Sequence, residues 1–553
     1  MMNPASLPRW GMVVDINRCV GCQTCTIACK HANDTTPGTQ WRSVLDLEHG
    51  VFPNVQREFL VVGCQHCAEP SCVPVCPSGA TKQRADGLVT MDYELCIGCG
   101  YCAVSCPYQA RSIVHGKQWY FGESTIQEEA VQHEDRIGVA QKCTFCIERV
   151  DEAMETGADP GTNPDYMPAC AASCIAQAIT FGDFNDPGSR VSQLKKSNAS
   201  FQMHEHLGND PQIHYLYELP TTPGHEIAAE DCSDDILGDP ANPLVGKRQT
   251  FWDARAASNF ILGGMGSGLA FLAMVFHFAG FIPEQALVTI QAGAGVFVFT
   301  GLSIVLMEIG RKFRFLNALL RPQSSWLTRE TYCAGIFFPA MLFDYFHPQP
   351  WLHLVTGLAA LGFLYCQARI LQAGKGIPAW RAPLIPWMLL ATGLLEGSGL
   401  LLLGSMLLSP TLSYNTSMAW VGVLCAATTG LLWKRYRRSA EAAGIPPLAR
   451  RELERVSPFV SLAGHILPLA GFFVLTGFAD PGWLRGVTVV VAGAGAVLGG
   501  ALWKFIVITR ASYQQGFAIP WLPQRGSGSR AAPVRYGLPH VAMGSDPEVP
   551  GAV

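Results

Sequence analysis

Long apolar stretches occupy the second half of the chain, whereas the first half alternates short apolar runs with polar turns. From residue 257 onward there are eight predominantly apolar spans. They cover approximately 258–282, 286–309, 331–347, 351–372, 384–409, 416–433, 457–478 and 486–508. Because roughly 20 residues at a rise of about 1.5 Å cross a hydrocarbon core of about 30 Å, the pattern predicts an all-α membrane bundle of eight helices.

Basic residues are distributed unevenly among the loops that join these spans. The segments before the first span and after the second, fourth and sixth spans contain eighteen Lys and Arg residues, whereas the opposite loops contain only Arg485. Positive charge in loops is retained on the cytoplasmic side of a membrane. We therefore expect a multi-pass inner-membrane protein whose first half and both termini are cytoplasmic.

Composition adds information about the first half of the chain. The chain has 553 residues and a net charge of −4, so no basic excess indicates a nucleic-acid partner. Sixteen of its 20 cysteines lie before residue 175, and no apolar run of signal-peptide length precedes Cys19. Cysteines at this density, without a secretion signal, indicate metal ligands rather than disulfides.

The cysteines form four consecutive groups of four. The first and third groups are spaced C-x2-C-x2-C-x3-C, and Asp15 and Asp92 stand four residues before them, which suggests an internal duplication. The second group has four residues in its middle gap, and the fourth has a 23-residue insertion. The groups are Cys19, Cys22, Cys25 and Cys29; Cys64, Cys67, Cys72 and Cys76; Cys96, Cys99, Cys102 and Cys106; and Cys143, Cys146, Cys170 and Cys174.

This spacing has a physical reason. Three cysteines two residues apart can bind three corners of one iron–sulfur cube, while the fourth points to a neighbouring cube. A proline directly follows the last cysteine of groups two and three, as in two-cluster ferredoxins. We therefore expect groups two and three to exchange Cys76 and Cys106, and groups one and four to exchange Cys29 and Cys174. The result would be four [4Fe–4S] clusters.

Structural zinc is the alternative for these sixteen cysteines. Zinc sites usually consist of separated C-x2-C pairs rather than a run of three with an offset fourth, so the spacing favours iron–sulfur clusters. The other four cysteines, Cys232, Cys333, Cys366 and Cys425, are isolated in the sequence. Three of them lie in apolar runs, and we expect inert buried thiols there.

The cysteine groups and the apolar spans together define the domain organisation. Short β-rich stretches between the groups, at 59–63 and 87–92, predict an α+β ferredoxin-like domain over residues 1–190. The rest of the chain is then a polar linker or strap (191–256), the helical membrane region (257–512) and a cytoplasmic tail (513–553).

Charged residues gather where the second and third spans meet the loop between them. Glu308 ends the second span, Glu330 opens the third, and Arg311 and Arg314 lie between them. Ionisable residues at membrane depth indicate function by default. A quinone head group needs an acid that exchanges protons and a hydrogen-bond donor, and these residues could supply both. The alternative is a solvated basic loop with ordinary interfacial charges.

Histidines in the spans leave haem as a weaker alternative. His277 and His353 fall toward the outer side and His465 nearer the inner side, so few histidines match in depth. A histidine in a span is more often hydrogen-bonded between helices. We therefore do not expect haem.

On these motifs the chain resembles a known family. Residues 12–185, with all four cysteine groups, are similar to the four-cluster electron-transfer subunit of dimethyl sulfoxide reductase-type molybdoenzymes. Nitrate reductase relatives have Trp at the second position of group three, where this chain has Cys99, which implies four [4Fe–4S] clusters. Residues 257–512 resemble the eight-helix membrane anchor of the same enzymes, notably over MEIGRKFRFLNALLRPQSSWLTRETYCAGIFF. The two subunits are usually separate chains and are fused here.

The resemblance also carries functional implications. It implies that Arg314, Glu330 and the position of Glu308 serve a quinol site, although the dimethyl sulfoxide reductase anchor has a histidine where Glu308 stands. Anchors of this type lack haem. The implied function is electron transfer between a molybdopterin-containing catalytic subunit and the membrane quinone pool, without substrate chemistry on this chain.

Several enzymes of this type are compatible with a cytoplasmic orientation. Quinone-linked sulfite dehydrogenase is the leading candidate, and phenylacetyl-CoA:quinone oxidoreductase is another. The anchor of a dimethyl sulfoxide or polysulfide-type reductase is a further alternative. A zinc-stapled membrane scaffold without a redox role is the alternative from a different functional class.

Overall fold

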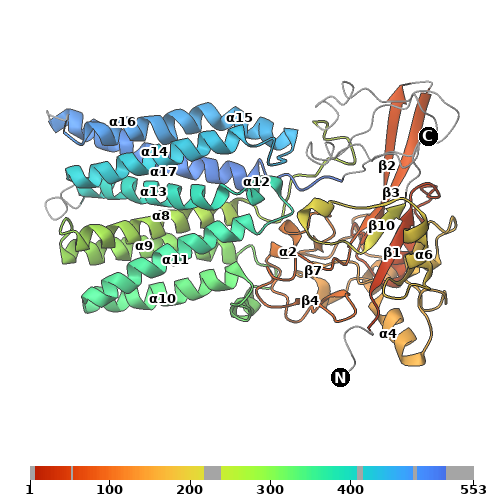
Figure 1. Cartoon of the computed structure of the whole chain (residues 1–553). Helices are drawn as coiled ribbons and strands as arrows, with labels where there is room; N and C mark the ends of the chain where they lie inside the picture. Colours follow the sequence, from red (N-terminus) through yellow and green to blue (C-terminus); the bar gives the residue numbers. More distant parts are fainter. Residues whose placement is uncertain (1–6, 52–53, 217–237, 408–414, 478–481, 518–553) are drawn as a thin grey trace. The chain divides into compact units, whose positions relative to one another are not determined.

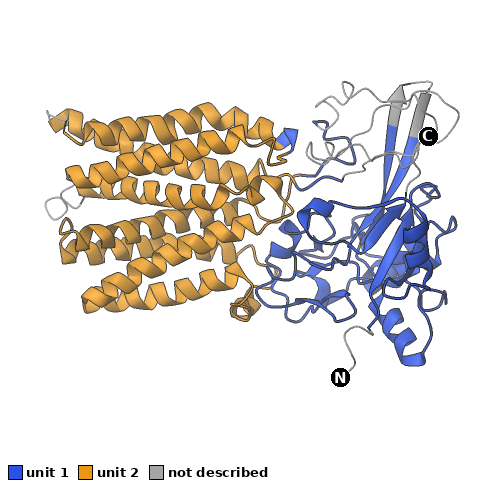
Figure 2. Ribbon diagram, in the orientation of Figure 1, with its two compact units in different colours: residues 1–247, 446–448, 514–553 blue, residues 248–445, 449–513 orange. Residues whose placement is uncertain are grey.

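The computed structural model describes residues 7–51, 54–216, 238–407, 415–477 and 482–517 (Figure 1). The chain divides into two compact units (Figure 2). Unit 1 comprises residues 1–247, 446–448 and 514–553, and unit 2 comprises residues 248–445 and 449–513. The division agrees with the change from cysteine-rich to apolar sequence.

A four-stranded sheet in the order β8-β1-β10-β9 forms the centre of unit 1. Its strands are β1 (Trp10–Asp15), β8 (Ile179–Asp183), β9 (Ser200–Gln202) and β10 (Ile213–Leu216). β1 pairs antiparallel with β8 and parallel with β10. The near-continuous apolar sequences of β1 and β10 suit these two inner positions, where every residue of β10 and nearly every residue of β1 is buried.

Three two-stranded antiparallel sheets and several short helices complete unit 1. The strand pairs are β2 (Arg42–Val51) with β3 (Asn54–Gly63), β4 (Thr81–Gln83) with β5 (Val89–Met91), and β6 (Ser112–Ile113) with β7 (Ala140–Gln141), and the first two pairs are hairpins. The helices are α1 (Thr24–Ala32), α2 (Tyr101–Val104), α3 (Ile126–Ala130), α4 (Ile147–Thr156), α5 (Ala169–Ala172) and α6 (Arg190–Ser197), with 3₁₀ turns η2 (Glu134–Arg136) and η3 (Glu205–Leu207). Of the two stretches expected to be β-rich, 59–63 lies within β3 and 87–92 contains β5.

The expected polar linker, 191–256, is in part a folded piece of unit 1. α6, β9 and β10 lie in its first third, and β10 pairs with β1 over Met12↔Ile213 to Asp15↔Leu216. The sequence did not indicate these elements, because the segment has no cysteine ligands and its strands are too short for a clear alternation. Further along, 244–247 pairs with 514–517 through Gln514 N to Lys247 O at 2.9 Å and Phe517 N to Leu244 O at 2.8 Å.

Unit 2 is a bundle of long helices in which each long helix runs antiparallel to the one before it in the chain (Figure 1). They are α8 (Ala254–Phe278), α9 (Glu284–Leu306), α10 (Trp326–Phe346), α11 (Pro350–Gln372), α13 (Ile385–Leu407), α14 (Thr416–Arg438), α15 (Pro447–Ser461) continued by the π-helical η6 (Leu462–Ile466) and α16 (Leu467–Val474), and α17 (Gly482–Thr509). The 3₁₀ segment η5 (Lys312–Leu319) and the short helix α12 (Pro378–Arg381) lie in the connections.

Seven of the described helices are long and apolar enough to cross a membrane, with Pro447–Val474 taken as one. The sequence predicted eight spans. The predicted third span corresponds to α10, which is 21 residues long but is not among the seven. It contains Arg329, Glu330 and Asp344, which lower its mean hydropathy. α10 also begins five residues earlier than predicted, so Glu330 lies inside the helix rather than at its start.

Glycines allow α8 to approach α13 closely. A Cβ atom on Gly268 of α8 would lie 1.8 Å from the backbone oxygen of Gly393, and one on Gly397 would lie 2.4 Å from the carbonyl carbon of Gly268. Side chains cannot fit at these positions. Small residues at helix contacts are typical of membrane bundles, where close backbone packing replaces the hydrophobic driving force.

We predict that Gly268→Ala lowers the thermal stability of the purified protein in detergent, because one added methyl group separates α8 from α13. Overpacking of this kind costs about 1–3 kcal/mol. Gly335→Ala in α10 is the matched control, since a Cβ there would have no neighbour within 4 Å. Equal melting temperatures for the two variants would contradict the close contact.

Candidate functional site

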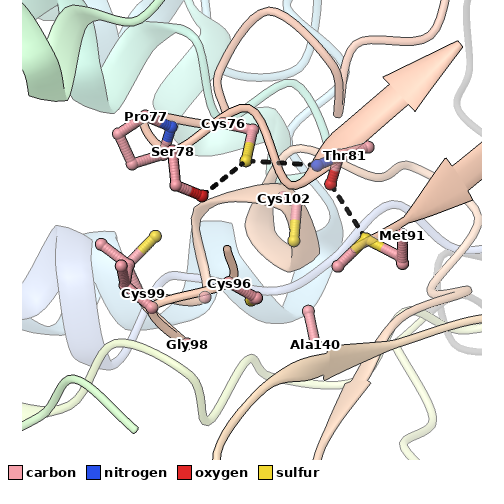
Figure 3. A pocket seen from close by; sticks show the side chains of 12 residues that line it. Cys76, Pro77, Ser78, Thr81, Met91, Cys96, Gly98, Cys99, Cys102 and Ala140 are labelled. Carbon is pink, nitrogen blue, oxygen red and sulfur yellow. Dashed lines mark hydrogen bonds between the residues drawn. The ribbon is translucent and has the colours of Figure 1, made fainter. Parts of the chain in front are cut away.

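Cys76 faces three cysteines of the next group across one cavity of unit 1 (Figure 3). The sulfur atoms of Cys76, Cys99 and Cys102 point into the space between them, and Cys96 also lines it. The backbone N–H of Thr81 donates to Cys76 Sγ at 3.5 Å. This set contains the fourth cysteine of group two and the first three of group three, the combination that the exchanged pairing predicts.

The other twelve cysteines form three similar sets. Cys64, Cys67, Cys72 and Cys106 line a second cavity, and Cys19, Cys22, Cys25 and Cys174 line a third. In the fourth set, Asn33 Nδ2 lies 3.8 Å from Cys29 Sγ and 3.7 Å from Cys146 Sγ, and the thiols of Cys143 and Cys170 are electrostatic neighbours of Cys29. Each set again joins three cysteines of one group to the last cysteine of another.

A repeated backbone turn gives the cysteine loops their shape. The residue immediately before the second cysteine of every group has a positive φ: 68° at Gly21, 42° at His66, 74° at Gly98 and 56° at Phe145. The left-handed conformation turns the chain sharply between two cysteines. It is costly for residues other than glycine, so His66 and Phe145 must be held by their surroundings. Their rings stack with centroids 3.8 Å apart.

The internal duplication predicted from Asp15 and Asp92 is visible in local structure. Asp15 ends β1 and accepts a hydrogen bond from the backbone N–H of Asn17 at 3.0 Å. Asp92 follows β5 and accepts from the backbone N–H groups of Glu94 and Leu95 at 3.1 and 3.0 Å. In both copies the carboxylate therefore closes a turn that leads from a strand into a cysteine loop.

The donor set fits an iron–sulfur cluster better than single zinc ions. A zinc site needs its thiolates about 2.3 Å from one point. Four thiols around a shared cavity instead suit a group with several metal atoms, each bound by one cysteine.

A buried arginine lies between two of the cysteine sets. Arg111 lines the cavity of Cys64, Cys67, Cys72 and Cys106, and its Nη2 donates to Cys72 Sγ at 3.1 Å. Its Nη1 lies 3.2 Å from Thr81 Oγ1 and 3.0 Å from Met91 Sδ. Thr81 and Met91 line the neighbouring cavity of Cys76, Cys96, Cys99 and Cys102 (Figure 3). One permanent positive charge is therefore shared by two candidate cluster sites.

Two further cations are fully buried among the cysteines. Arg42, at the start of β2, is an electrostatic neighbour of Cys170, Cys143 and Cys29, and its Nη2 lies 3.3 Å from Met12 Sδ in β1. The Lys142 Nζ donates to the backbone oxygen of Cys143 at 2.7 Å. The sequence motifs did not point to these cations, because nothing in their spacing separates them from surface charges.

The buried cations counteract the rise in pKa that burial causes in the thiols. Desolvation raises the pKa of Cys143 and Cys170 to about 11, and the positive charge of Arg42 acts against this rise. Desolvation likewise raises the pKa of Cys102 and Cys106 to about 12, against the charge of Arg111. Cysteine binds metals as the thiolate, so buried cations favour the form that ligation requires.

In unit 2, the two predicted quinone-site acids lie beside consecutive turns of α8. The backbone N–H of Asp253, the N-cap of α8, donates to Glu308 Oε1 at 2.9 Å. The Glu330 side chain is buried and hydrogen-bonded to the side chains of Asn259 and Gln367. Arg311 and Arg314 are half-buried on the segment that connects α9 to α10.

The structure also reveals an ion pair that the sequence interpretation missed. Glu396 of α13 and Lys504 of α17 are both fully buried, and Lys504 Nζ lies 2.6 Å from Glu396 Oε2. Each is a lone charge inside a predicted apolar span, and that signal could have identified them. Asn259 and Gln367, the partners of Glu330, were missed as well, because single amides in apolar helices are common.

Cysteines and histidines of the spans have specific neighbours. Cys333 of α10 and Cys366 of α11 are not isolated, since their thiols are within hydrogen-bonding distance of each other. Cys425 is buried, and Cys232 lies outside the described residues. His353 Nδ1 lies 2.7 Å from Asp344 Oδ2, and His277 Nδ1 lies 2.8 Å from the backbone oxygen of Ile282. One nitrogen of each ring is thus engaged within the bundle.

Comparison with known proteins identifies the first half of the chain. Residues 55–122, which contain cysteine groups two and three, match the family described as "4Fe-4S dicluster domain". A selenate reductase subunit of Mesobacillus selenatarsenatis is 37% identical over 233 residues, which are 39% of this chain and 74% of that protein. The iron–sulfur cluster-binding subunit of menaquinone reductase of Nitratidesulfovibrio vulgaris is 40% identical over 226 residues, or 38% and 88% of the two chains. The chain belongs to this family of iron–sulfur subunits.

Another relative bears on the more specific expectations. A sulfite dehydrogenase subunit of Allochromatium vinosum is 37% identical over 221 residues, 37% of this chain and 81% of that protein. The predicted resemblance is therefore confirmed: an electron-transfer iron–sulfur subunit is joined here to a region of apolar helices, which is consistent with a fusion of two subunits.

We predict that Arg111→Gln lowers the midpoint potentials of two clusters together, because a nearby positive charge stabilises the reduced, more negative state. One charge at this range is worth about 1–2 kcal/mol, or roughly 40–90 mV for a one-electron couple. Redox titration followed by electron paramagnetic resonance measures the shift. Arg111→Lys keeps the charge and should shift the potentials less. Arg57→Gln is the surface control, since Arg57 is 57% exposed. Unchanged potentials in Arg111→Gln would refute the shared role.

We also predict about sixteen iron atoms for each anaerobically purified chain, four for each of four clusters. Cys99→Ser should alter or remove only the cluster whose cavity contains Cys76 and Cys102, while the helical unit still inserts into the membrane. Iron and zinc analysis with resonance spectra of the reduced protein checks both statements. Zinc as the main metal, or fewer than three clusters, would contradict the prediction.

Proposed function

We propose that this chain carries electrons between a molybdopterin-containing catalytic subunit and membrane quinone, through four [4Fe–4S] clusters. The observation that carries the proposal is the presence, in one chain, of four sets of four cysteines and a bundle of helices long enough to cross a membrane. When bound, the clusters supply one-electron transfer, and the protein sets their spacing and potential.

Quinone as the membrane substrate is supported by two observations. The name of the Nitratidesulfovibrio relative includes menaquinone reductase. In this chain, Glu308 and Glu330 lie at the same end of the bundle, beside consecutive turns of α8, together with the segment that contains Arg311 and Arg314. Reduction of a quinone takes two electrons and two protons, so an acid beside the head group is required.

The proposed roles follow from the chemistry of these side chains. Glu330 exchanges a proton with a quinone oxygen, and the amides of Asn259 and Gln367 orient its carboxyl group. Arg314 donates hydrogen bonds to the other carbonyl and favours the negative charge that develops there. Glu308 serves as a second acid nearer the end of the helix.

Orientation and substrate complete the proposal. The charge asymmetry of the loops supports a cytoplasmic location for unit 1 and for both termini, with the helices in the cell inner membrane. Similarity to the sulfite dehydrogenase subunit of Allochromatium vinosum favours sulfite as the electron donor of the partner. The anchor of a selenate or dimethyl sulfoxide-type reductase is the second candidate, supported by the selenate reductase relative.

The topology predicts the behaviour of fused reporters. A reporter after Val553 should be active only in its cytoplasmic form, and reporters at Pro348 and Tyr414 only in their periplasmic form, because eighteen of nineteen loop cations lie on one side. A periplasmic carboxy terminus would overturn the orientation and the choice of cytoplasm-facing enzymes.

Glu330→Gln tests the quinone site. The full chain is reduced, freed of reductant and mixed with a short-chain quinone, and the return of cluster absorbance is followed by stopped flow. We expect oxidation by quinone to slow at least about tenfold, as loss of a general acid does. Oxidation by ferricyanide, which takes no proton, should be unchanged.

Two further variants complete this test. Arg314→Ala should also slow oxidation by quinone while it preserves the cluster spectra. Glu284→Gln is the control, since Glu284 begins α9 at the opposite end of the bundle and is 56% exposed on its side chain. If both Glu330→Gln and Arg314→Ala react with quinone at the normal rate, these residues only anchor the helix ends.

A further inference from the structure

The Glu396–Lys504 pair lies at the centre of three helices of unit 2. In addition to its bond with Glu396, Lys504 Nζ donates to the backbone oxygen of Phe260 in α8 at 3.3 Å. Glycines provide the space. A Cβ on Gly264 would lie 2.4 Å from Lys504 Nζ, and one on Gly500 would lie 2.3 Å from Glu396 Oε1.

The pair adjoins the hydrogen-bonded surroundings of Glu330. Gln367 Nε2 donates to the backbone oxygen of Asn259, the residue before Phe260, at 3.0 Å. A Cβ on Gly263 would lie 2.4 Å from Gln367 Nε2, and Gly264, the next residue, contacts Lys504 in the same way. Glu330, Gln367 and Lys504 therefore gather around the same two turns of α8.

Four buried acceptor oxygens near these two turns of α8 lack a hydrogen-bond donor. Glu396 Oε1, Gln367 Oε1, Asn259 Oδ1 and Glu330 Oε1 are buried and have no hydrogen-bond partner among the described protein groups. Buried acceptors of this kind are normally satisfied by ordered water, and each water needs several polar partners. Asn259 Oδ1 lies against Gly301 of α9 and Glu396 Oε1 against Gly500 of α17, and ordered waters at these oxygens would supply the missing partners.

Stability does not account for the pair. Taking two charges out of water costs several kcal/mol for each ion, and replacement of a buried ion pair by packed apolar residues is often neutral or stabilising. Ionisable residues inside a membrane bundle are rare and mark ion or proton pathways. Small residues would pack these helices as well, as glycines do elsewhere in α8 and α13.

We propose that Glu396 and Lys504 form a proton-exchange station that supplies Glu330 during quinone chemistry, an inference that rests on the proposed quinone site. In quinone reduction, two electrons from the reduced clusters reach the quinone, Glu330 gives one proton to one quinone oxygen, and Glu308 gives the second proton to the other oxygen. An N–H bond of Lys504 then breaks, its electron pair stays on nitrogen, and the proton passes through ordered water at the buried acceptor oxygens to the Glu330 carboxylate. Glu396 holds the ammonium in place and favours its reprotonation from water. The sequence of steps reverses in quinol oxidation.

The test separates proton exchange from helix packing. The double variant Glu396→Leu with Lys504→Met replaces the pair by apolar groups, which should preserve the melting temperature and the cluster spectra. We expect oxidation of the reduced full chain by a short-chain quinone to slow at least about tenfold. We also expect the rate to rise more steeply as pH falls, because protons must then come from bulk water. Oxidation by ferricyanide should be unchanged.

Two single variants and one control complete the design. Glu396→Gln and Lys504→Met should each slow the quinone reaction, and Asp344→Asn, which removes a buried charge at the opposite end of α10, should not. A double variant that reacts with quinone at the normal rate and pH dependence overturns the proposal. Failure of the quinone site itself has a different signature, since Glu330→Gln would then leave the rate unchanged or the unmodified chain would not react with quinone.

Discussion

Burial of thiols that must act as thiolates is the constraint on which unit 1 depends. Sixteen cysteines lie before residue 175, and most of them are buried. Negative charge cannot be gathered in a low-dielectric interior without positive charge nearby. Arg42, Arg111 and Lys142 provide it from inside the domain. The sheet and hairpins hold these cations in place: Arg42 begins β2 and contacts Met12 of β1, and Arg111 is held by Thr81 and Met91 of the β4–β5 hairpin.

Buried charges also need partners in unit 2, where they lie between apolar helices. A buried charge between apolar helices needs a partner of opposite sign or a hydrogen-bond network. Glu396 has Lys504, Asp344 has His353, and Glu330 has two amides. Glycines along α8 create the space for two of these arrangements and also bring α8 into backbone contact with α13. The same glycines therefore allow both the close packing of the helices and the burial of polar groups between them.

Family membership and the helical unit lead to one functional interpretation. The relatives establish that the first half transfers electrons as an iron–sulfur subunit. Electron transfer requires no proton, whereas quinone chemistry requires two. On this interpretation the two units have different tasks. Buried cations among the cysteines of unit 1 adjust the reduction potentials of the clusters. Acids beside α8 of unit 2 transfer protons to and from quinone.

The sequence by itself determined the cysteine sets and the helical region. The C-x2-C-x2-C-x3-C spacing of groups one and three, together with the prolines after Cys76 and Cys106, allowed the exchange of fourth cysteines to be predicted. Hydropathy located the helices because membrane thickness fixes their length. Local pattern failed where it carried little information, as in β9 and β10 of the expected linker and in the charged start of α10.

Tertiary structure alone decided which isolated residues meet. Lys504 and Glu396 are 108 residues apart, and Arg111 and Cys72 are 39 apart, with no motif connecting either pair. Their contacts depend on how helices and hairpins pack, which follows from the summed burial of many side chains rather than from local spacing. A lone charge in an apolar span shows that a partner is needed. Only the packed structure shows which residue that partner is.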